Sequence, residues 1–201
     1  MNKAIFIDKD GTLIHDVPFN VDPSKIVFFE DAFSALQKLV AAGYKIIVIS
    51  NQSGIAYGYF EAEKINVVEE EMRVQLKTRN IPLEAFYYCP HHPNGTIKPF
   101  NVGCSCRKPA PGMILKAAEA LEIDLSISWM VGDILNDVEA GNKAGCKTVL
   151  IDNGGETEWV TGIDRIPHFI VKNLTEAAER ILEVKVNKEG IEERSNFLWN
   201  N

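Results

Sequence analysis

The chain has 201 residues, of which 46% are hydrophobic and 24% are charged, close to the averages for soluble globular proteins. This length suits one core, so we expect no second domain. The net charge of -7 argues against nucleic acid as a partner, since binding it would need a basic patch. No apolar run approaches the roughly 18 residues of a membrane span, and the first one meets Asp8 too early for a signal peptide. We therefore expect a cytoplasmic protein that binds no membrane, and a monomer.

Short apolar runs alternate with amphipathic stretches, a pattern that indicates buried parallel strands separated by helices. The expected strands are residues 4–7, 46–49, 85–88, 129–131 and 148–151, followed by a last strand at 168–171. Residues 31–42 place apolar side chains on one helical face, and Gly43 suits the position after the helix. The order predicts an α/β fold with a Rossmann-like parallel sheet and helices on both faces.

Helix boundaries are marked in the second half of the chain as well. Pro109 and Pro111 suit the entrance to a helix at 113–121, and Gly145 suits the exit of the helix after Asp133. Asn173 and Glu176 form the pattern of a capping box, in which two side chains satisfy free N–H groups at a helix start. We expect one domain over residues 1–183 and a frayed C-terminal tail over residues 184–201.

Polar residues follow several of these apolar runs directly. Asp8 and Asp10, Ser50 to Gln52, and Asp133 with Asp137 lie just past such runs, and Arg107 and Lys108 precede the helix expected at 113–121. In an open parallel sheet such positions converge at the carboxyl ends of the strands, where ligands bind. Alone, Asp-x-Asp-Gly is often a turn or a calcium-type loop. Together the residues suit magnesium-assisted phosphoryl transfer through an aspartyl phosphate.

The order and spacing of these segments closely resemble the four motifs of the haloacid dehalogenase superfamily of phosphohydrolases. The resemblance extends to about residue 182. It implies that Asp8 is the nucleophile and that Asp10 is the general acid and base. It also implies that Ser50 and backbone amides near Asn51 bind phosphoryl oxygens, while Lys108 neutralises developing charge.

The same resemblance implies a magnesium site and a particular direction for one side chain. Mg²⁺ would be held by the Asp8 carboxylate, the Asp10 backbone carbonyl and Asp133. Asp137, one helical turn after Asp133, would support this metal shell instead of binding the ion directly. Lys9, the middle residue of the first motif, would point away from the site.

A second group of residues has the composition of a zinc site. Cys89, His91, Cys104 and Cys106 form two pairs separated by a loop rich in Pro, Gly and Asn. Buried cysteines or a disulfide are the alternatives, and an intracellular chain disfavours the disulfide. Four such ligands suit a closed tetrahedral Zn²⁺ site with a structural role, which we expect in the loop at residues 89–106. His92 and Cys146 are not expected to take part.

The zinc-type loop narrows the resemblance to a branch that holds heptose bisphosphate phosphatases and histidinol-phosphate phosphatases. The segments 50–58 and 87–93 resemble the heptose enzymes, although Tyr57 stands where that branch commonly has arginine. The implied reaction is hydrolysis of the C7 phosphate of D-glycero-D-manno-heptose 1,7-bisphosphate, a phosphorylated sugar. The short connection over residues 13–30 implies a minimal cap. The residues expected to bind substrate are Asp16, Phe19, Asn51, Gln52, Ser53 and Arg107.

Three other functions fit parts of the sequence. A histidinol-phosphate phosphatase would perform the same chemistry on a different alcohol. A phospho-acceptor signalling module also combines an aspartyl phosphate, a hydroxyl, a lysine and Mg²⁺, but its phosphorylated aspartate follows a later strand. A zinc-binding scaffold without catalysis would leave the four polar segments unexplained. Asp10, which supplies an acid and base beside the nucleophile, favours rapid turnover over a stored signal.

Overall fold

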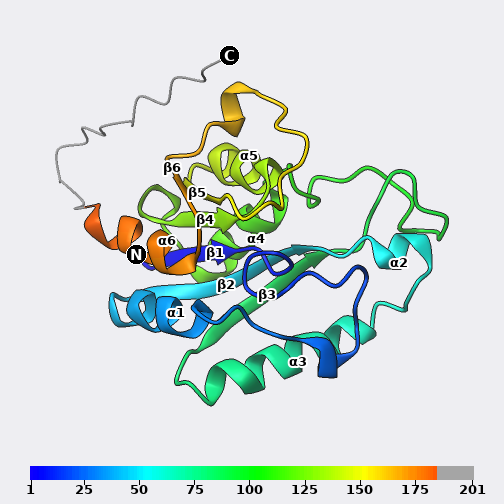
Figure 1. Ribbon diagram of the computed structural model, residues 1–201. Coiled ribbons are helices and arrows are strands. Elements are labelled where there is room, and N and C mark those ends of the chain that lie inside the picture. Colours follow the sequence, from blue (N-terminus) through cyan, green and yellow to red (C-terminus); the bar gives the residue numbers. More distant parts are fainter. Residues whose placement is uncertain (185–201) are drawn as a thin grey trace.

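The computed structural model describes residues 1–184, and its centre is a fully parallel sheet of six strands (Figure 1). The strand order is β3-β2-β1-β4-β5-β6. The predicted strands are therefore confirmed, each within a few residues of its expected bounds. The expected tail lies outside the described residues, apart from Val184. The strands are β1 Lys3–Ile7, β2 Tyr44–Asn51, β3 Leu83–Cys89, β4 Trp129–Gly132, β5 Lys147–Ile151 and β6 Phe169–Val171.

Helices cover both faces of the sheet, as expected (Figure 1). One face carries α1, α3 and α6, and the other carries α4 and α5. The helices are α1 Ala32–Ala41, α2 Gly54–Tyr57, α3 Lys64–Lys77, α4 Gly112–Leu121, α5 Leu135–Ala144 and α6 Leu174–Glu183, with short 3-10 turns at Pro23–Lys25, Leu125–Ile127 and Ile163–Arg165.

The side chains of β1 show why the sheet is buried on both faces. Ile5 and Ile7 pack into the cluster under α1, α3 and α6, whereas Ala4 and Phe6 pack into the cluster under α4 and α5. All four are fully buried. Alternation of side chains along a strand sends successive residues to opposite faces, so a continuous apolar run is what a central strand of this sheet requires.

The helix ends follow the sequence signals, with one difference. Pro111 precedes α4, and Gly145 ends α5 with a φ of 91°, a conformation that favours glycine. The Asn173 side chain accepts from the Glu176 N–H at 2.9 Å, as the capping box requires. The Glu176 carboxylate, however, accepts from the Lys172 N–H at 3.0 Å. In the predicted capping box the Glu176 carboxylate would accept from the Asn173 N–H. It accepts instead from the N–H of Lys172, one residue earlier.

Connections at the carboxyl ends of the strands have very unequal lengths. Residues 13–30, between β1 and α1, contain the short turn at Pro23–Lys25 and one isolated bridge between Ile14 and Phe28, so no cap domain is inserted in this described segment. Residues 90–111 form a long loop after β3 that lies beside α2, with Thr96 and Ile97 donating to the Ala56 carbonyl (Figure 1). Within the described part of the chain, none of the helices has the length and apolar character needed to cross a membrane.

Candidate active site

Most of the predicted polar residues line one open cavity of about 540 Å³ at the carboxyl ends of the strands, whereas Gln52 and Asp137 are not part of its lining. Its walls come from the loops that follow β1, β2, β4 and β5 and from the segment before α4. The lining residues are Asp8, Asp10, Gly11, Asp16, Phe29, Ser50, Asn51, Arg107, Lys108, Asp133, Ile134, Asn136, Asn153, Gly154 and Gly155. The convergence predicted from the strand ends is thus observed.

Lys108 occupies the centre of the charged group. Its side chain is buried, and its Nζ lies 2.6 Å from both Asp8 Oδ1 and Asp137 Oδ1. The same Nζ donates to the Ile49 carbonyl at 2.9 Å. Burial lowers the pKa of this ammonium, but the carboxylates of Asp137 and Asp8 outweigh it and hold the pKa above its ordinary value. Lys108 is therefore a fixed positive charge at the floor of the cavity.

Three carboxylates lie around this lysine. Asp8, Asp133 and Asp137 each offer an oxygen, and these oxygens lie within 4.8 Å of one another. Burial raises the pKa of Asp8, with Lys108 opposing it, and burial followed by the Asp137 charge raises the pKa of Asp133 to about 7. Clustered, buried carboxylates repel one another, so this donor set fits a hard divalent cation that takes oxygen ligands.

Close backbone packing fixes Asp133 from two sides. A Cβ at Gly11, whose φ is 78°, would lie 2.3 Å from Asp133 Oδ2, and a Cβ at Gly155 would lie 2.0 Å from the same oxygen. Thr12 Oγ1 donates to Asp133 Oδ1 at 3.1 Å. Asn153 Nδ2 donates to the Gly11 carbonyl at 2.8 Å, joining the loops after β1 and β5. The carboxylate can hold this place only because glycine occupies both neighbouring positions.

Asp10 lies at the cavity wall, with its two carboxylate oxygens held by different side chains. Gln52 Nε2 donates to Asp10 Oδ2 at 3.1 Å and to Ser50 Oγ at 2.7 Å. Lys9 Nζ lies 2.5 Å from Asp10 Oδ1. The expectation that Lys9 points away is wrong: the tight turn after β1, in which Leu13 N–H donates to the Lys9 carbonyl, leaves the lysine side chain buried beside Asp10.

The remaining expected contacts divide into those that line the cavity and those that do not. Asp16 and Arg107 line it, and the Arg107 guanidinium also donates to the His91 carbonyl at 3.4 Å. The Asn51 side chain pairs with the Lys108 backbone through two hydrogen bonds of 3.1 Å. Ser53 precedes α2 and is not among the lining residues.

Phe19 is not among the cavity-lining residues and packs in an aromatic group. Its ring centroid is 4.6 Å from that of Tyr59 and 6.3 Å from that of Tyr57. The sequence reasoning missed other lining residues, namely Phe29, Ile134, Asn136, Asn153, Gly154 and Gly155. The strand-end rule could have indicated Asn153, because β5 ends two residues earlier. Phe29 carries no such signal.

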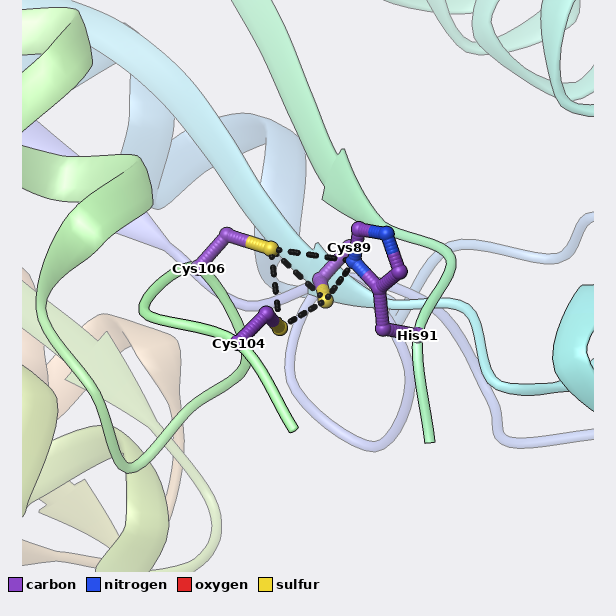
Figure 2. A group of neighbouring side chains, drawn as sticks. All are labelled: Cys89, His91, Cys104 and Cys106. Atoms are coloured by element: carbon purple, nitrogen blue, oxygen red, sulfur yellow. Dashed lines mark hydrogen bonds between the residues drawn. The ribbon is translucent and has the colours of Figure 1, made fainter. Parts of the chain in front are cut away.

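The four expected zinc ligands come together beside this cavity, with their side chains pointing toward one another (Figure 2). Cys89 ends β3, and Cys104 and Cys106 lie on the returning arm of the long loop. Cys106 Sγ is 3.0 Å from Cys89 Sγ, 3.1 Å from Cys104 Sγ and 3.4 Å from His91 Nδ1. All four cysteines of the chain are free thiols. Three thiols and one imidazole around a single point fit a tetrahedral metal site.

The two residues expected to stay out of this cluster do so. His92 Nδ1 lies 2.9 Å from the Tyr57 hydroxyl, outside the cluster. Cys146 is buried in the core under α4 and α5, and burial raises the pKa of its thiol to about 12. Its low accessibility and high pKa make it an inert packing residue.

The comparisons with known proteins agree with this geometry. The HAD-hydrolase-like family model matches residues 105–177. The D-glycero-beta-D-manno-heptose-1,7-bisphosphate 7-phosphatase of Pasteurella multocida (strain Pm70) is 43% identical over 155 residues, which are 77% of this chain and 84% of the relative. The protein of the same name from Escherichia coli (strain K12) is 40% identical over 152 residues, or 75% of this chain and 80% of the relative.

Two solved structures share the fold over 90% of this chain. A putative HAD-like phosphatase from Mesorhizobium loti has a TM-score of 0.77 and 30% identity, with 87% of its chain covered. The D,D-heptose 1.7-bisphosphate phosphatase from B. bronchiseptica, complexed with magnesium and phosphate, has a TM-score of 0.72 and 29% identity, with 98% covered. The chain belongs to the haloacid dehalogenase superfamily of phosphatases. It is therefore a phosphoric monoester hydrolase, and the signalling and scaffold alternatives are set aside.

Proposed function

We propose that this phosphatase is a D-glycero-D-manno-heptose 1,7-bisphosphate 7-phosphatase that depends on Mg²⁺ and works through an aspartyl phosphate. The observation that carries the proposal is the identity of 40 to 43% with relatives of that name over three quarters of the chain. The cavity supports it, because it gathers the carboxylates and the lysine that such a reaction needs.

The proposed reaction has two displacements. In the first, an Asp8 oxygen attacks phosphorus, the bond from phosphorus to the C7 oxygen breaks, and Asp10 gives a proton to the departing oxygen. In the second, Asp10 takes a proton from a water molecule, which attacks phosphorus and breaks the bond to Asp8. Inorganic phosphate leaves and both aspartates return to their starting states. Proximity of Asp8 and Asp10 in one cavity is what this sequence of steps requires.

Charge at phosphorus is balanced by groups around the cavity floor. Lys108 and the Ser50 hydroxyl, with backbone amides near Asn51, would bind the phosphoryl oxygens. When bound by Asp8, the Asp10 carbonyl and Asp133, Mg²⁺ would supply further positive charge against the repulsion between nucleophile and phosphate. Asp137 would act through Lys108, whose ammonium it holds at 2.6 Å.

A structural Zn²⁺ ion would be held by Cys89, His91, Cys104 and Cys106. Four protein ligands would leave no position open for substrate, and their loop runs directly into Arg107. Because Cys89 ends β3 while Cys106 precedes Arg107, a metal bridging them would tie the long loop to the sheet. In this proposal the zinc ion positions Arg107, the cation at which the loop reaches the cavity wall.

The preference for the C7 phosphate follows from the shape of the site. A primary phosphate on an extended carbon can reach Asp8 with less crowding than an anomeric phosphate held against the ring. The second phosphate would lie near Arg107, whose planar guanidinium suits phosphate oxygens. Contacts to the sugar would come from Asp16 and Asn51, which line the cavity, whereas Phe19, Gln52 and Ser53, also expected from the sequence, are not part of its lining.

Replacing Arg107 with alanine tests the assignment of substrate. We expect kcat/KM for the 1,7-bisphosphate to fall by about 10–100-fold, the worth of a charged hydrogen-bonded contact, with a much smaller loss for a simple monophosphate. Arg180→Ala, an exposed arginine on α6, is the matched control. Phosphorus NMR of the products shows which phosphate leaves. Release of the anomeric phosphate, or faster turnover of histidinol phosphate, would reject the heptose assignment while leaving the phosphatase chemistry in place.

The proposed magnesium site also predicts a pH-dependent stabilisation. In the absence of a cation the pKa of Asp133 is raised from 3.8 to about 7, so its contribution to stability is present at low pH and is lost as the pH rises through 7. Mg²⁺ competes with that proton. We expect a Mg²⁺ concentration equal to 100 times the Kd at pH 8 to raise Tm by about 5–10 °C at that pH, and the same concentration to raise it by clearly less at pH 5.5, where proton competition weakens binding. Asp133→Asn should abolish the difference; an equal shift at both pH values would contradict the assignment.

A further inference from the structure

Lys9 is a buried cation with no role in the reaction described above. Its side chain is 3% exposed, and its ammonium lies 2.5 Å from Asp10 Oδ1. The backbone around it is fixed, since the Lys9 carbonyl accepts from the N–H groups of Leu13 and Ile14 at 3.0 Å each. Burying an ammonium is costly unless it is paired. An apolar residue of similar size would fill this place without that cost, so the charge calls for an explanation.

The explanation lies in the position of Asp10, whose side chain is 29% exposed at the cavity wall. A carboxylate on an open wall can rotate freely unless donors hold it. Here the buried ammonium of Lys9 contacts Oδ1 at 2.5 Å, and Gln52 donates to Oδ2 at 3.1 Å. Gln52 is itself anchored by its 2.7 Å contact with Ser50 Oγ. The two donors come from the ends of neighbouring strands, β1 and β2, so the orientation of Asp10 is set by the sheet.

We propose that Lys9, together with Gln52, is a positioning residue that holds the Asp10 carboxyl group in the orientation required for proton transfer. The inference rests on the proposed function, which assigns the proton transfers to Asp10. Proton transfer is effective only when donor and acceptor are within hydrogen-bond reach and aligned, and misplacement of a catalytic group carries a large penalty in rate. Lys9 acts through Asp10 and does not contact the substrate.

The test uses the full-length enzyme and two kinds of phosphate ester. An alkyl phosphate needs a proton on its departing oxygen, whereas p-nitrophenyl phosphate releases a stable anion and does not. Lys9→Met should lower single-turnover cleavage of the alkyl ester by about 10–100-fold, part of the factor that a general acid contributes. The first-turnover burst of p-nitrophenolate should change little. Lys9→Arg, which keeps a cationic donor, should recover most of the loss, and exposed Lys25→Met should match the wild type.

A double-mutant cycle separates positioning from a structural effect. If Lys9 acts through Asp10, Lys9→Met should add little further loss in an Asp10→Asn background. Equal losses with both esters, additive losses in the cycle, or wild-type rates in Lys9→Met would each overturn the inference. Wild-type turnover of the alkyl ester by Asp10→Asn would instead reject the proposed mechanism. Should Lys9→Met fail to fold, Gln52→Leu removes the second donor and should show the same dependence on the leaving group.

Discussion

Replacing Asp8 with asparagine is expected to abolish phosphate release without unfolding the protein. The Asp8 side chain is 10% exposed and pairs with Lys108, so the site is more enclosed than its position after a strand suggested. Asparagine has the same shape and relieves part of the repulsion with Asp133 and Asp137, which offsets the lost ion pair. Rates should fall by at least about 10⁴-fold, as in enzymes that lose a covalent nucleophile. Phosphate release and thermal unfolding measure the two effects.

Asp10→Asn serves as the comparison for this experiment. It should lose about 10²–10⁴-fold in turnover, yet still form a phosphorylated enzyme with an activated ester, whereas Asp8→Asn should form none. Mass spectrometry after rapid quenching detects the added phosphoryl group. A well-folded Asp8→Asn protein that releases phosphate at the wild-type rate would exclude the covalent route.

Replacing Cys106 with serine is expected to remove the proposed zinc ion. Cys106 lies within 3.4 Å of the other three ligand atoms, so its loss opens the whole cluster. Loss of a bound metal is among the few single changes that cost more than about 4 kcal/mol. Elemental analysis should give one zinc per wild-type chain and almost none in the variant, with proteolysis appearing within residues 90–108 and activity falling as a secondary effect.

Cys146→Ala is the matched control, because it removes a thiol that packs in the core and lies outside the cluster. It should keep one zinc per chain. Chelators should remove zinc more slowly than Mg²⁺, since a closed thiolate site exchanges less readily than a hydrated one. Readdition of Mg²⁺ alone should not restore protection of the loop. Wild-type protein that contains no zinc and still resists proteolysis at residues 90–108 would refute the structural role.

Local sequence patterns were sufficient to predict the strands of the sheet and the polar residues at their ends. Apolar runs such as residues 46–49 predict strands because a parallel sheet buries both faces of each strand, and the polar residue after each run then falls at the same edge. That rule alone brings Asp8, Ser50 and Asp133 together. The grouping of Cys89, His91, Cys104 and Cys106 was predictable for a similar reason: thiols and imidazole in close pairs have few other uses in a loop rich in Pro and Gly.

Such rules could not predict contacts between segments that lie far apart in the sequence. The direction of Lys9 depends on the turn that follows it and on the place left beside Asp10. The engagement of Gln52 by Asp10, 42 residues away, depends on which strands become neighbours. Gly155 and Thr12 meet at Asp133 for the same reason, as products of the folded arrangement with no periodic signal. The hydrogen bond from the Lys172 N–H to the Glu176 carboxylate is another contact that the sequence pattern did not predict.

Lys108 is anchored independently of the loop that precedes it. Its backbone is tied to the Asn51 side chain, and its ammonium is tied to the Ile49 carbonyl and to Asp137. These partners belong to β2 and α5, not to the loop that carries the proposed zinc ligands. Contacts with β2 and α5 thus hold the Lys108 ammonium in place even if residues 90–106 move. A change in residues 90–106 should therefore displace Arg107, which contacts the His91 carbonyl, more than the Lys108 ammonium.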